Sequence, residues 1–233
     1  MRLSCQGLAL FSLRMKLKRS HGMALVLMGV FILTRWPSLM PPNFSAAYGL
    51  LFCAGVYFRG DLAWWIPLVV MGVADGLLDY FVYWRSYGIP FQWYQLLNYP
   101  VYLVLLGLGR WFHPQHSWGR LVGGGLLGSL IFYLLTNTAA WLFNPFGNPE
   151  YVKTVHGWWI ALTQGTSGHP PTWEFLRNTL LSGGLFTGLF VGAMKAVDAM
   201  ESAAEKAAAN LEGAETALSE DPDAQPEAEE TVA

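Results

Sequence analysis

The amino-acid sequence predicts an all-α membrane protein: a six-transmembrane-helix bundle with its N- and C-termini in the cytoplasm and a disordered, acidic C-terminal tail. Composition predicts the membrane class, because 53% of the residues are hydrophobic and only 13% are charged, whereas soluble domains carry about 25% charged residues. The mean hydropathy is +0.32 although a very polar tail is included in the average. Six separate apolar segments predict the number of helices.

The chain begins with a basic segment, residues 1–21, which we expect in the cytoplasm. Its charged residues are Arg2, Arg14, Lys16, Lys18 and Arg19. The apolar run 22–34 follows and ends at Arg35 without the small-residue cleavage site of a signal peptide, so it predicts a first membrane helix. Met15 or Met23 is an alternative translation start.

Five further apolar segments complete the predicted transmembrane domain, residues 22–197. They are residues 44–58, 62–84, 96–112, 121–143 and 179–197. A helix needs about 20 residues to cross the hydrocarbon core. We therefore expect the two short segments, 44–58 and 96–112, to be tilted or to continue into their flanking residues.

Basic residues in the connections predict the orientation. With the N-terminus inside, the cytoplasmic side receives the N-terminal cluster together with Arg59, Arg110, Arg120 and Lys195. The outer side receives one base per connection or helix end, namely Arg35, Arg85, Lys153 and Arg177. The positive-inside rule thus predicts that both termini of this multi-pass protein, which is in contact with the lipid bilayer, lie in the cytoplasm. The longest loop, 144–178, is then external and is expected to hold a short amphipathic helix at about residues 151–163.

The tail, residues 198–233, differs from the rest of the chain in charge. It contains eleven acidic residues and one base, which leaves five acids and thirteen bases in the body. The tail is expected to begin as a helical extension of the last span. Beyond that it is rich in Ala, Glu and Pro, cannot bury enough apolar surface to offset its ordering entropy, and is predicted to be disordered.

Asp75 and Asp79 stand in the third apolar segment, four residues apart and therefore on one helix face. The helical rise places them in the outer half of the membrane. Other polar residues predicted at this depth are Arg35, Asn43, Asn98, Thr136, Asn137, Thr138, Arg177 and Asn178. An ionisable group costs ~2.5–3.5 kcal/mol inside a membrane helix and usually faces the bundle interior. Asp75 lowers this cost by pairing with Arg35 or Arg177, or by taking a proton.

The polar residues at this depth have two interpretations. The functional one is an outward-facing pocket for a small polar ligand, lined by Asp75, Asn137, Arg177, Asn178, Asn43, Arg35 and Asp79, with tryptophans of the outer loop as a lid. The structural one is a network of ion pairs and hydrogen bonds that fixes helix packing. Under that interpretation Asp79 is an interfacial residue in contact with headgroup water.

Catalytic and metal-binding motifs have little support. The sequence contains no Walker-type phosphate loop, no G-x-S-x-G and no zinc-protease motif. His113 and His116 form an H-x-x-H without a further ligand nearby, which is a weak metal pattern, and Cys5 and Cys53 are not expected to form a disulfide. We therefore expect no enzyme activity, no metal, no cofactor and no nucleic-acid partner.

Four stretches resemble an uncharacterised family of bacterial six-span membrane proteins. They are PPNFSAAYGLLFCAGVYF (41–58), WWIPLVVMGVADGLLD (64–79), LGSLIFYLLTNTAAWL (127–142) and RNTLLSGGLF (177–186). The residues that match the family's pattern are Asn43, Asp75, Asn137, Asn178 and Thr179. Members of the family often have an aspartate after the glycine of the last motif, where this chain has Gly184, so the resemblance transfers no ligand role for that acid.

The architecture also looks like the substrate-binding S components of energy-coupling-factor vitamin transporters, which are six-helix bundles with an outward pocket. This resemblance implies binding or uptake of a small molecule together with an energising membrane partner subunit, because the chain has no nucleotide-binding motif. The alternative is a non-transporting scaffold whose acidic tail recruits a partner. An intramembrane enzyme is a more distant third interpretation.

Overall fold

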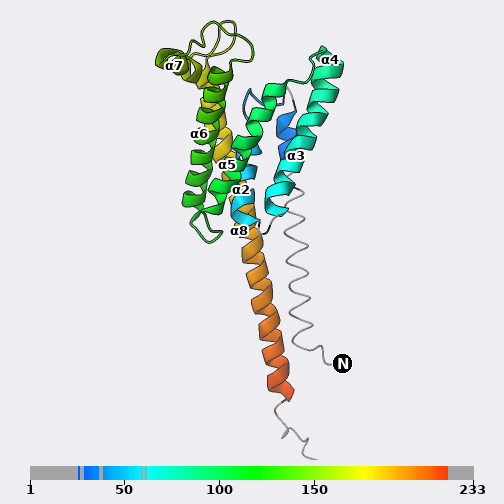
Figure 1. Cartoon of the computed structure of the whole chain (residues 1–233). Helices are drawn as coiled ribbons and strands as arrows, with labels where there is room; N and C mark the ends of the chain where they lie inside the picture. The colour runs from blue at the N-terminus through cyan, green and yellow to red at the C-terminus, as the bar shows by residue number, and fades with distance from the viewer. Residues whose placement is uncertain (1–25, 27–28, 37–38, 59, 61, 220–233) are drawn as a thin grey trace, which may run out of the picture.

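The computed structural model describes residues 26, 29–36, 39–58, 60 and 62–219. In this part of the chain every regular element is helical (Figure 1), which confirms the predicted all-α class. The α-helices are α2 (Ala47–Tyr57), α3 (Leu62–Leu78), α4 (Arg85–Tyr87), α5 (Asn98–Arg110), α6 (Trp118–Phe143), α7 (Val155–Thr163) and α8 (Thr172–Ser219). A π-helix, η1 (Asp79–Trp84), joins α3 to α4, a 3₁₀ helix, η2 (Trp93–Leu97), precedes α5, and residues 29–35 are also helical. The basic segment 1–21 and residues 220–233 lie outside the described residues.

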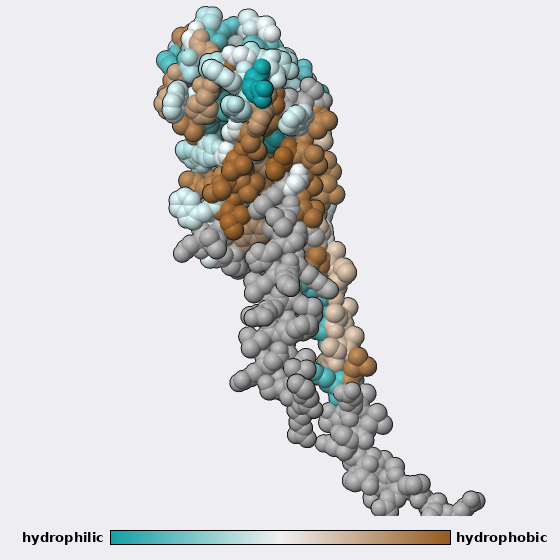
Figure 2. All heavy atoms as spheres, turned by 90° about the vertical axis from the view of Figure 1, so that its right-hand side faces the viewer, coloured by the Kyte–Doolittle hydropathy of each residue, from teal (hydrophilic) through white to brown (hydrophobic). Residues whose placement is uncertain are grey.

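Three helical stretches are long and apolar enough to cross a membrane, as the composition predicts. They are Trp64–Tyr87, Trp118–Phe143 and Thr172–Glu212, with 24, 26 and 41 residues. Large apolar side chains on the outer face of α3 are exposed, including Trp65, Val69, Val73 and Leu77 at four-residue spacing. Figure 2 shows hydrophobic residues over the middle of this face and hydrophilic residues at the end that carries α4 and α7.

The predicted short segments form the short helices α2 and α5, of 11 and 13 residues. α2 lies at the centre of the bundle, where α3, α5, α6 and α8 pack around it. All of its residues from Ala47 to Val56 are buried, which is typical of a helix that is hydrophobic on every side. At 1.5 Å per residue α2 is only about 16 Å long. Residues 39–46, which lead into α2, are not helical.

Small residues let the helices approach closely, as their clustering in the sequence suggests. A Cβ at Gly55 of α2 would lie 2.2 Å from the carbonyl oxygen of Leu106, and one at Gly109 would lie 2.2 Å from that of Phe52. In the α6–α8 contact, Gly125 faces Thr187 and Gly183 faces Ser129. Gly55 and Gly109 thus allow backbone-to-backbone contact, and Gly125 and Gly183 make room for the side chains of Thr187 and Ser129, which is close packing of the kind that stabilises membrane bundles.

The first part of the tail is helical, and this helix runs far into the region for which the sequence predicts disorder. α8 continues without interruption to Ser219, so residues 198–219 are helical. Most side chains in 198–212 are exposed, so burial does not hold this extension together. Two local effects account for it: Ala and Glu have high helix propensity, and the extension grows from a formed helix and needs no new nucleus.

The bundle has two distinct ends. The α7 end, at the top of Figure 1, carries α4, α7 and the loop 144–154. Tyr133 Oη donates to the carbonyl oxygens of Leu162 and Thr172, and Trp158 Nε1 donates to Thr138 Oγ1, which ties α7 to α6 and α8. The predicted helix at about 151–163 is α7, which begins at Val155. At the opposite end, Lys195 Nζ donates to the Pro114 carbonyl and fixes the α5–α6 connection against α8.

Candidate functional site

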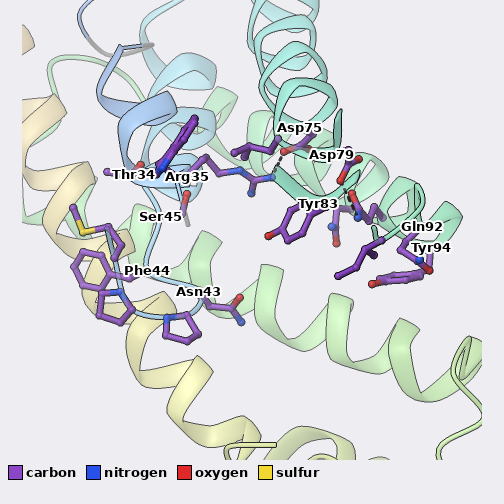
Figure 3. Close-up of a pocket in the computed structure, with 18 of the residues that line it drawn as sticks. Thr34, Arg35, Asn43, Phe44, Ser45, Asp75, Asp79, Tyr83, Gln92 and Tyr94 are labelled. Atoms are coloured by element: carbon purple, nitrogen blue, oxygen red, sulfur yellow. Dashed lines mark hydrogen bonds and ion pairs between the residues drawn. The ribbon is translucent and has the colours of Figure 1, made fainter. Parts of the chain in front are cut away.

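A cavity of about 540 Å³ opens near the α7 end of the bundle. Three stretches line it: residues 34–36 and 40–45 before α2, residues 75–83 at the end of α3 and in η1, and residues 89–98 before and at the start of α5. Tyr48 of α2 also lines it. Figure 3 shows polar side chains from all three stretches converging on this space. Five of the predicted polar residues line it, namely Arg35, Asn43, Asp75, Asp79 and Asn98.

An ion pair crosses one wall of the cavity. The Arg35 guanidinium, from the end of the helical segment 29–35, donates to Asp75 Oδ1 on α3 (Figure 3). Tyr99 Oη donates to the second oxygen, Asp75 Oδ2, at 3.3 Å. The Arg35 guanidinium also lies 5.7 Å from the centre of the Phe31 ring. Both carboxylate oxygens of Asp75 are therefore satisfied, which lowers the cost of its burial.

Asp79 lies one helical turn after Asp75, and its carboxylate has fewer hydrogen-bond partners. Its Oδ1 accepts a hydrogen bond from Gln95 Nε2 at 3.3 Å. Its Oδ2 is buried, and none of the described residues donates to it. The α-helix changes to the π-helix η1 at this residue, and π-turns inside α-helices occur frequently at functional sites.

The non-helical stretch before α2 forms a second wall and is held by side-chain hydrogen bonds. Asn43 has a left-handed backbone with φ of 59°, a conformation that asparagine tolerates better than most residues. Its carbonyl accepts from Tyr48 Oη at 3.3 Å. Thr34 Oγ1 accepts from the Ala46 N–H and Ser45 Oγ accepts from the Ala47 N–H. These two bonds satisfy backbone donors at the start of α2.

Asn178 supports this wall from outside the cavity. It is 8% exposed, and its Nδ2 donates to the Pro42 carbonyl at 2.9 Å. The sequence predicts that Asn178 contacts a ligand, but the structure places it behind this wall and not among the residues that line the cavity.

Two other predicted site residues do not line the cavity. Asn137 Nδ2 donates to the Tyr133 carbonyl of its own helix, at 2.9 Å. Arg177 is exposed, and its guanidinium lies 5.6 Å from the centre of the Trp173 ring. Both stand on the helix pair α6–α8, whereas the cavity lies on the α3 side of the bundle. The sequence predicts depth along a helix, but it does not predict the direction around the helix axis.

A comparison with protein families matches residues 15–207 to DUF6580, a family of unknown function. The match covers most of the chain. This protein belongs to the DUF6580 family. A search of curated proteins found no match. The resemblance to an uncharacterised family is thereby confirmed, and every predicted site residue lies within the part of the chain that matches DUF6580.

The motif residues of this DUF6580 member fall into three structural roles. Asn43 and Asp75 line the cavity. Asn178 holds its wall, and the neighbouring Thr179 is buried, with 1% exposed. Asn137 makes a hydrogen bond within α6. The motifs therefore contribute to the pocket and to its support.

Several cavity residues are absent from the predicted set. They are Thr34, Ser45, Tyr48, Tyr83, Gln92, Tyr94 and Gln95, and Tyr99 acts through Asp75. The sequence contains one pattern that points to some of them: Gln92, Gln95 and Asn98 are three residues apart just before an apolar segment. Such spacing puts polar groups on one helical face.

The outer tryptophans do not form the predicted lid. Among the described tryptophans only Trp36 lines the cavity. Trp141 Nε1 donates to the Val152 carbonyl at 2.8 Å, and Trp158 bonds to Thr138. These two rings anchor the long loop to α6 instead of covering a ligand.

Proposed function

We propose that this protein is a multi-pass protein of the bacterial inner membrane that binds a small polar molecule in the cavity at the α7 end. One observation supports the proposal above the others: a cavity of about 540 Å³ is lined by charged and hydrogen-bonding side chains from three separate stretches of chain. Ligand pockets typically measure about 300–1,000 Å³ and carry a few convergent polar groups. A network that served packing alone would be expected to fill this space.

Six membrane segments are part of the proposal. Helices α2 and α5 are too short to span alone, yet they pack between the longer helices. Non-helical backbone is tolerated at membrane depth where it lines a polar cavity, and residues 39–46 before α2 do so.

The positive-inside rule then puts the cavity on the outer face and α8's C-terminal end in the cytoplasm. An outward pocket supports an uptake role like that of transporter S components, with a separate energising subunit.

A ligand screen on the purified protein tests the binding proposal. Full-length protein in lipid nanodiscs is heated with a panel of vitamins and small metabolites, and the shift of its unfolding midpoint is recorded. We expect at least one compound to raise the midpoint. Asp75→Asn should reduce this shift, measured from the variant's own unliganded midpoint.

Glu174→Gln is the matched control, since Glu174 is an acidic residue at the start of α8 that lies outside the cavity. It should keep the wild-type shift. Absence of any shift across the panel, or an equal loss in Glu174→Gln, would count against a ligand site in this cavity.

A scaffold role is the second candidate, and the helical extension of α8 favours it. Residues 198–212 are mostly exposed and are acidic apart from Lys206 among their charged side chains. A truncation after Val197 separates the two functions. Loss of a co-purifying partner, with no ligand found for the full chain, favours the scaffold.

A further inference from the structure

We infer that the ligand of this cavity carries a positively charged amine and that Asp79 is its counter-ion. The inference rests on the proposed function and names the chemical class that this pocket selects. The ionisable groups of the cavity give the first reason. Among the described residues that line it, the acidic and basic side chains are Arg35, Asp75 and Asp79. Arg35 and Asp75 neutralise each other as an ion pair, so the remaining carboxylate is that of Asp79.

The hydrogen bonds of Asp79 give the second reason. Gln95 donates to Oδ1, whereas the buried Oδ2 has no donor among the described residues. An ionised carboxylate accepts about four hydrogen bonds and donates none. A buried acceptor without a partner is unfavourable, and a buried charge without a counter-ion is more so. A ligand ammonium in the cavity that Asp79 lines supplies the missing counter-charge.

Aromatic side chains around the cavity give the third reason. Trp36, Tyr83 and Tyr94 line it, and Figure 3 shows Tyr83 and Tyr94 on the same side as Asp79. The faces of Trp and Tyr rings attract cations. The guanidinium of Arg35 already faces Asp75, so the described wall offers an anionic ligand no unpaired cation. The arrangement therefore favours an organic cation over a carboxylate or a phosphate.

Matched compounds test this inference. Tyramine, agmatine and choline serve as cations, and tyrosol and 4-hydroxyphenylacetate serve as the uncharged and anionic counterparts of tyramine. Affinity is measured by calorimetry on the full chain in nanodiscs. We expect tyramine to bind at least tenfold more tightly than tyrosol and 4-hydroxyphenylacetate.

Variants at Asp79 identify the counter-ion. Asp79→Asn should lower tyramine affinity at least tenfold and remove the preference over tyrosol. Asp79→Glu keeps the charge and should remain within a few-fold of wild type, which separates a charge effect from misfolding. Glu174→Gln removes a carboxylate at the start of α8, outside the cavity, and should leave the affinities unchanged.

Three outcomes overturn the inference. Equal binding of tyrosol or 4-hydroxyphenylacetate does so, as does an amine preference that survives in Asp79→Asn. If only uncharged or anionic compounds of the wider metabolite panel stabilise the protein, the amine inference fails while the binding function stands. If no compound binds in either screen, both fail.

Discussion

Asp75 is tolerated inside an apolar helix because two side chains satisfy it. Arg35 pairs with one carboxylate oxygen and Tyr99 donates to the other. The side chains of Arg35 and Asp75 are 27% and 15% exposed, so solvent only partly screens the pair. Removing one member of a buried pair costs about 3–5 kcal/mol, whereas replacing both with apolar residues is often nearly neutral. Because both side chains are partly exposed, the cost of removing one member of this pair is lower than that of a fully buried pair.

This pair yields a prediction for a double-mutant cycle. We expect Asp75→Leu to lower the free energy of unfolding by roughly 2–3 kcal/mol, because it leaves the Arg35 guanidinium without a counter-ion. The double variant Arg35→Met with Asp75→Leu should recover most of this loss. Denaturation of the purified protein in detergent measures all four corners of the cycle. A double variant no more stable than Asp75→Leu would show that the ion pair is not the main constraint.

Asn178 offers a prediction about support of the pocket wall. Asn178→Ala removes the donor to the Pro42 carbonyl and leaves that acceptor unsatisfied. We expect a loss of roughly 1–2 kcal/mol in unfolding free energy, together with weaker ligand binding. Asn137→Ala is the control, because Asn137 bonds only to its own helix among the described residues. Equal effects of both variants on ligand binding would contradict the positioning role of Asn178.

The individual site residues also show how much of the candidate site the sequence predicts. The sequence offers Arg35 or Arg177 as the partner of Asp75, and the structure selects Arg35. Depth along the helices is predictable from the 1.5 Å rise per residue. Rotation about each helix axis depends on packing partners, which a single sequence does not contain. The sequence therefore assigns Asn137 and Arg177 to the correct end of the bundle but to the wrong side.

At the scale of helices, contact between backbones determines how closely α2 and α5 pack. Gly55 and Gly109 face each other, and their Cα atoms approach so closely that an added Cβ on Gly55 would lie 2.9 Å from the Gly109 Cα. Backbone atoms cannot rotate away as a side chain can. The central helix α2 is thus positioned by two glycines, and with it the non-helical wall of the cavity.

Gly55→Ala should therefore destabilise the protein. Its Cβ would lie 2.2 Å from the Leu106 carbonyl oxygen, and overpacking of this kind costs about 1–3 kcal/mol. Gly123→Ala in α6 is the control, since no described atom beyond its chain neighbours and the backbone of its own helix lies within 4 Å of the place its methyl group would take, and alanine improves helix propensity by up to ~1 kcal/mol. Thermal unfolding in detergent compares the two. A Gly55→Ala midpoint at or above that of Gly123→Ala would contradict the close α2–α5 contact.

The loop segment 144–171, which connects α6 to α8 and contains α7, provides a prediction about titration. The Ser167 N–H donates to Glu150 Oε1 at 2.9 Å, and this hydrogen bond lowers the pKa of the Glu150 carboxyl from its ordinary value. A lowered pKa means that the interaction stabilises the loop above the ordinary glutamate range and is lost as the pH falls through the lowered pKa. Glu150→Gln should therefore increase hydrogen exchange of the 144–171 loop at neutral pH, with little change in α2. Unchanged exchange in the loop would show that this contact does not order it.

The helix positions that the sequence predicts and the features that it misses have different physical causes. Apolar runs and their flanks locate α3, α6 and α8, because burial in lipid requires long apolar segments. The short apolar segments are recognisable from the sequence. The non-helical stretch before α2 is not, because it depends on tertiary hydrogen bonds from Thr34 and Asn178. The sequence predicts that the last span continues as a helix into the tail and then becomes disordered, but not where the change occurs, and helix propensity continued from α8 prevails as far as Ser219.

For the whole molecule, the two ends of the bundle differ in how their basic residues are used. At the α7 end, Arg35 pairs with Asp75, and Lys153 donates to the carbonyls of Trp141 and Leu142. At the opposite end, Arg110 donates to the Gly60 carbonyl and stacks on Trp64, and Lys195 donates to Pro114. The acidic α8 extension leaves the bundle at this second end (Figure 1). Charge counts along the full sequence favour a cytoplasmic position for that end.

Cysteine labelling in intact cells tests this orientation. In a background with Cys5→Ser and Cys53→Ala, single variants Ser167→Cys, Ser117→Cys and Ser202→Cys place thiols in the loop after α7, in the α5–α6 connection and on the α8 extension. The six-span arrangement with cytoplasmic termini predicts that a membrane-impermeant maleimide labels Ser167→Cys in intact cells, because the α7 end is external. The other two should react only after lysis, because they share the opposite end. Labelling of Ser117→Cys and Ser167→Cys from the same side would exclude a crossing by α6. Labelling of both Ser117→Cys and Ser202→Cys from outside, without labelling of Ser167→Cys, would invert the orientation and place the cavity toward the cytoplasm, where it would serve export or sensing instead of uptake.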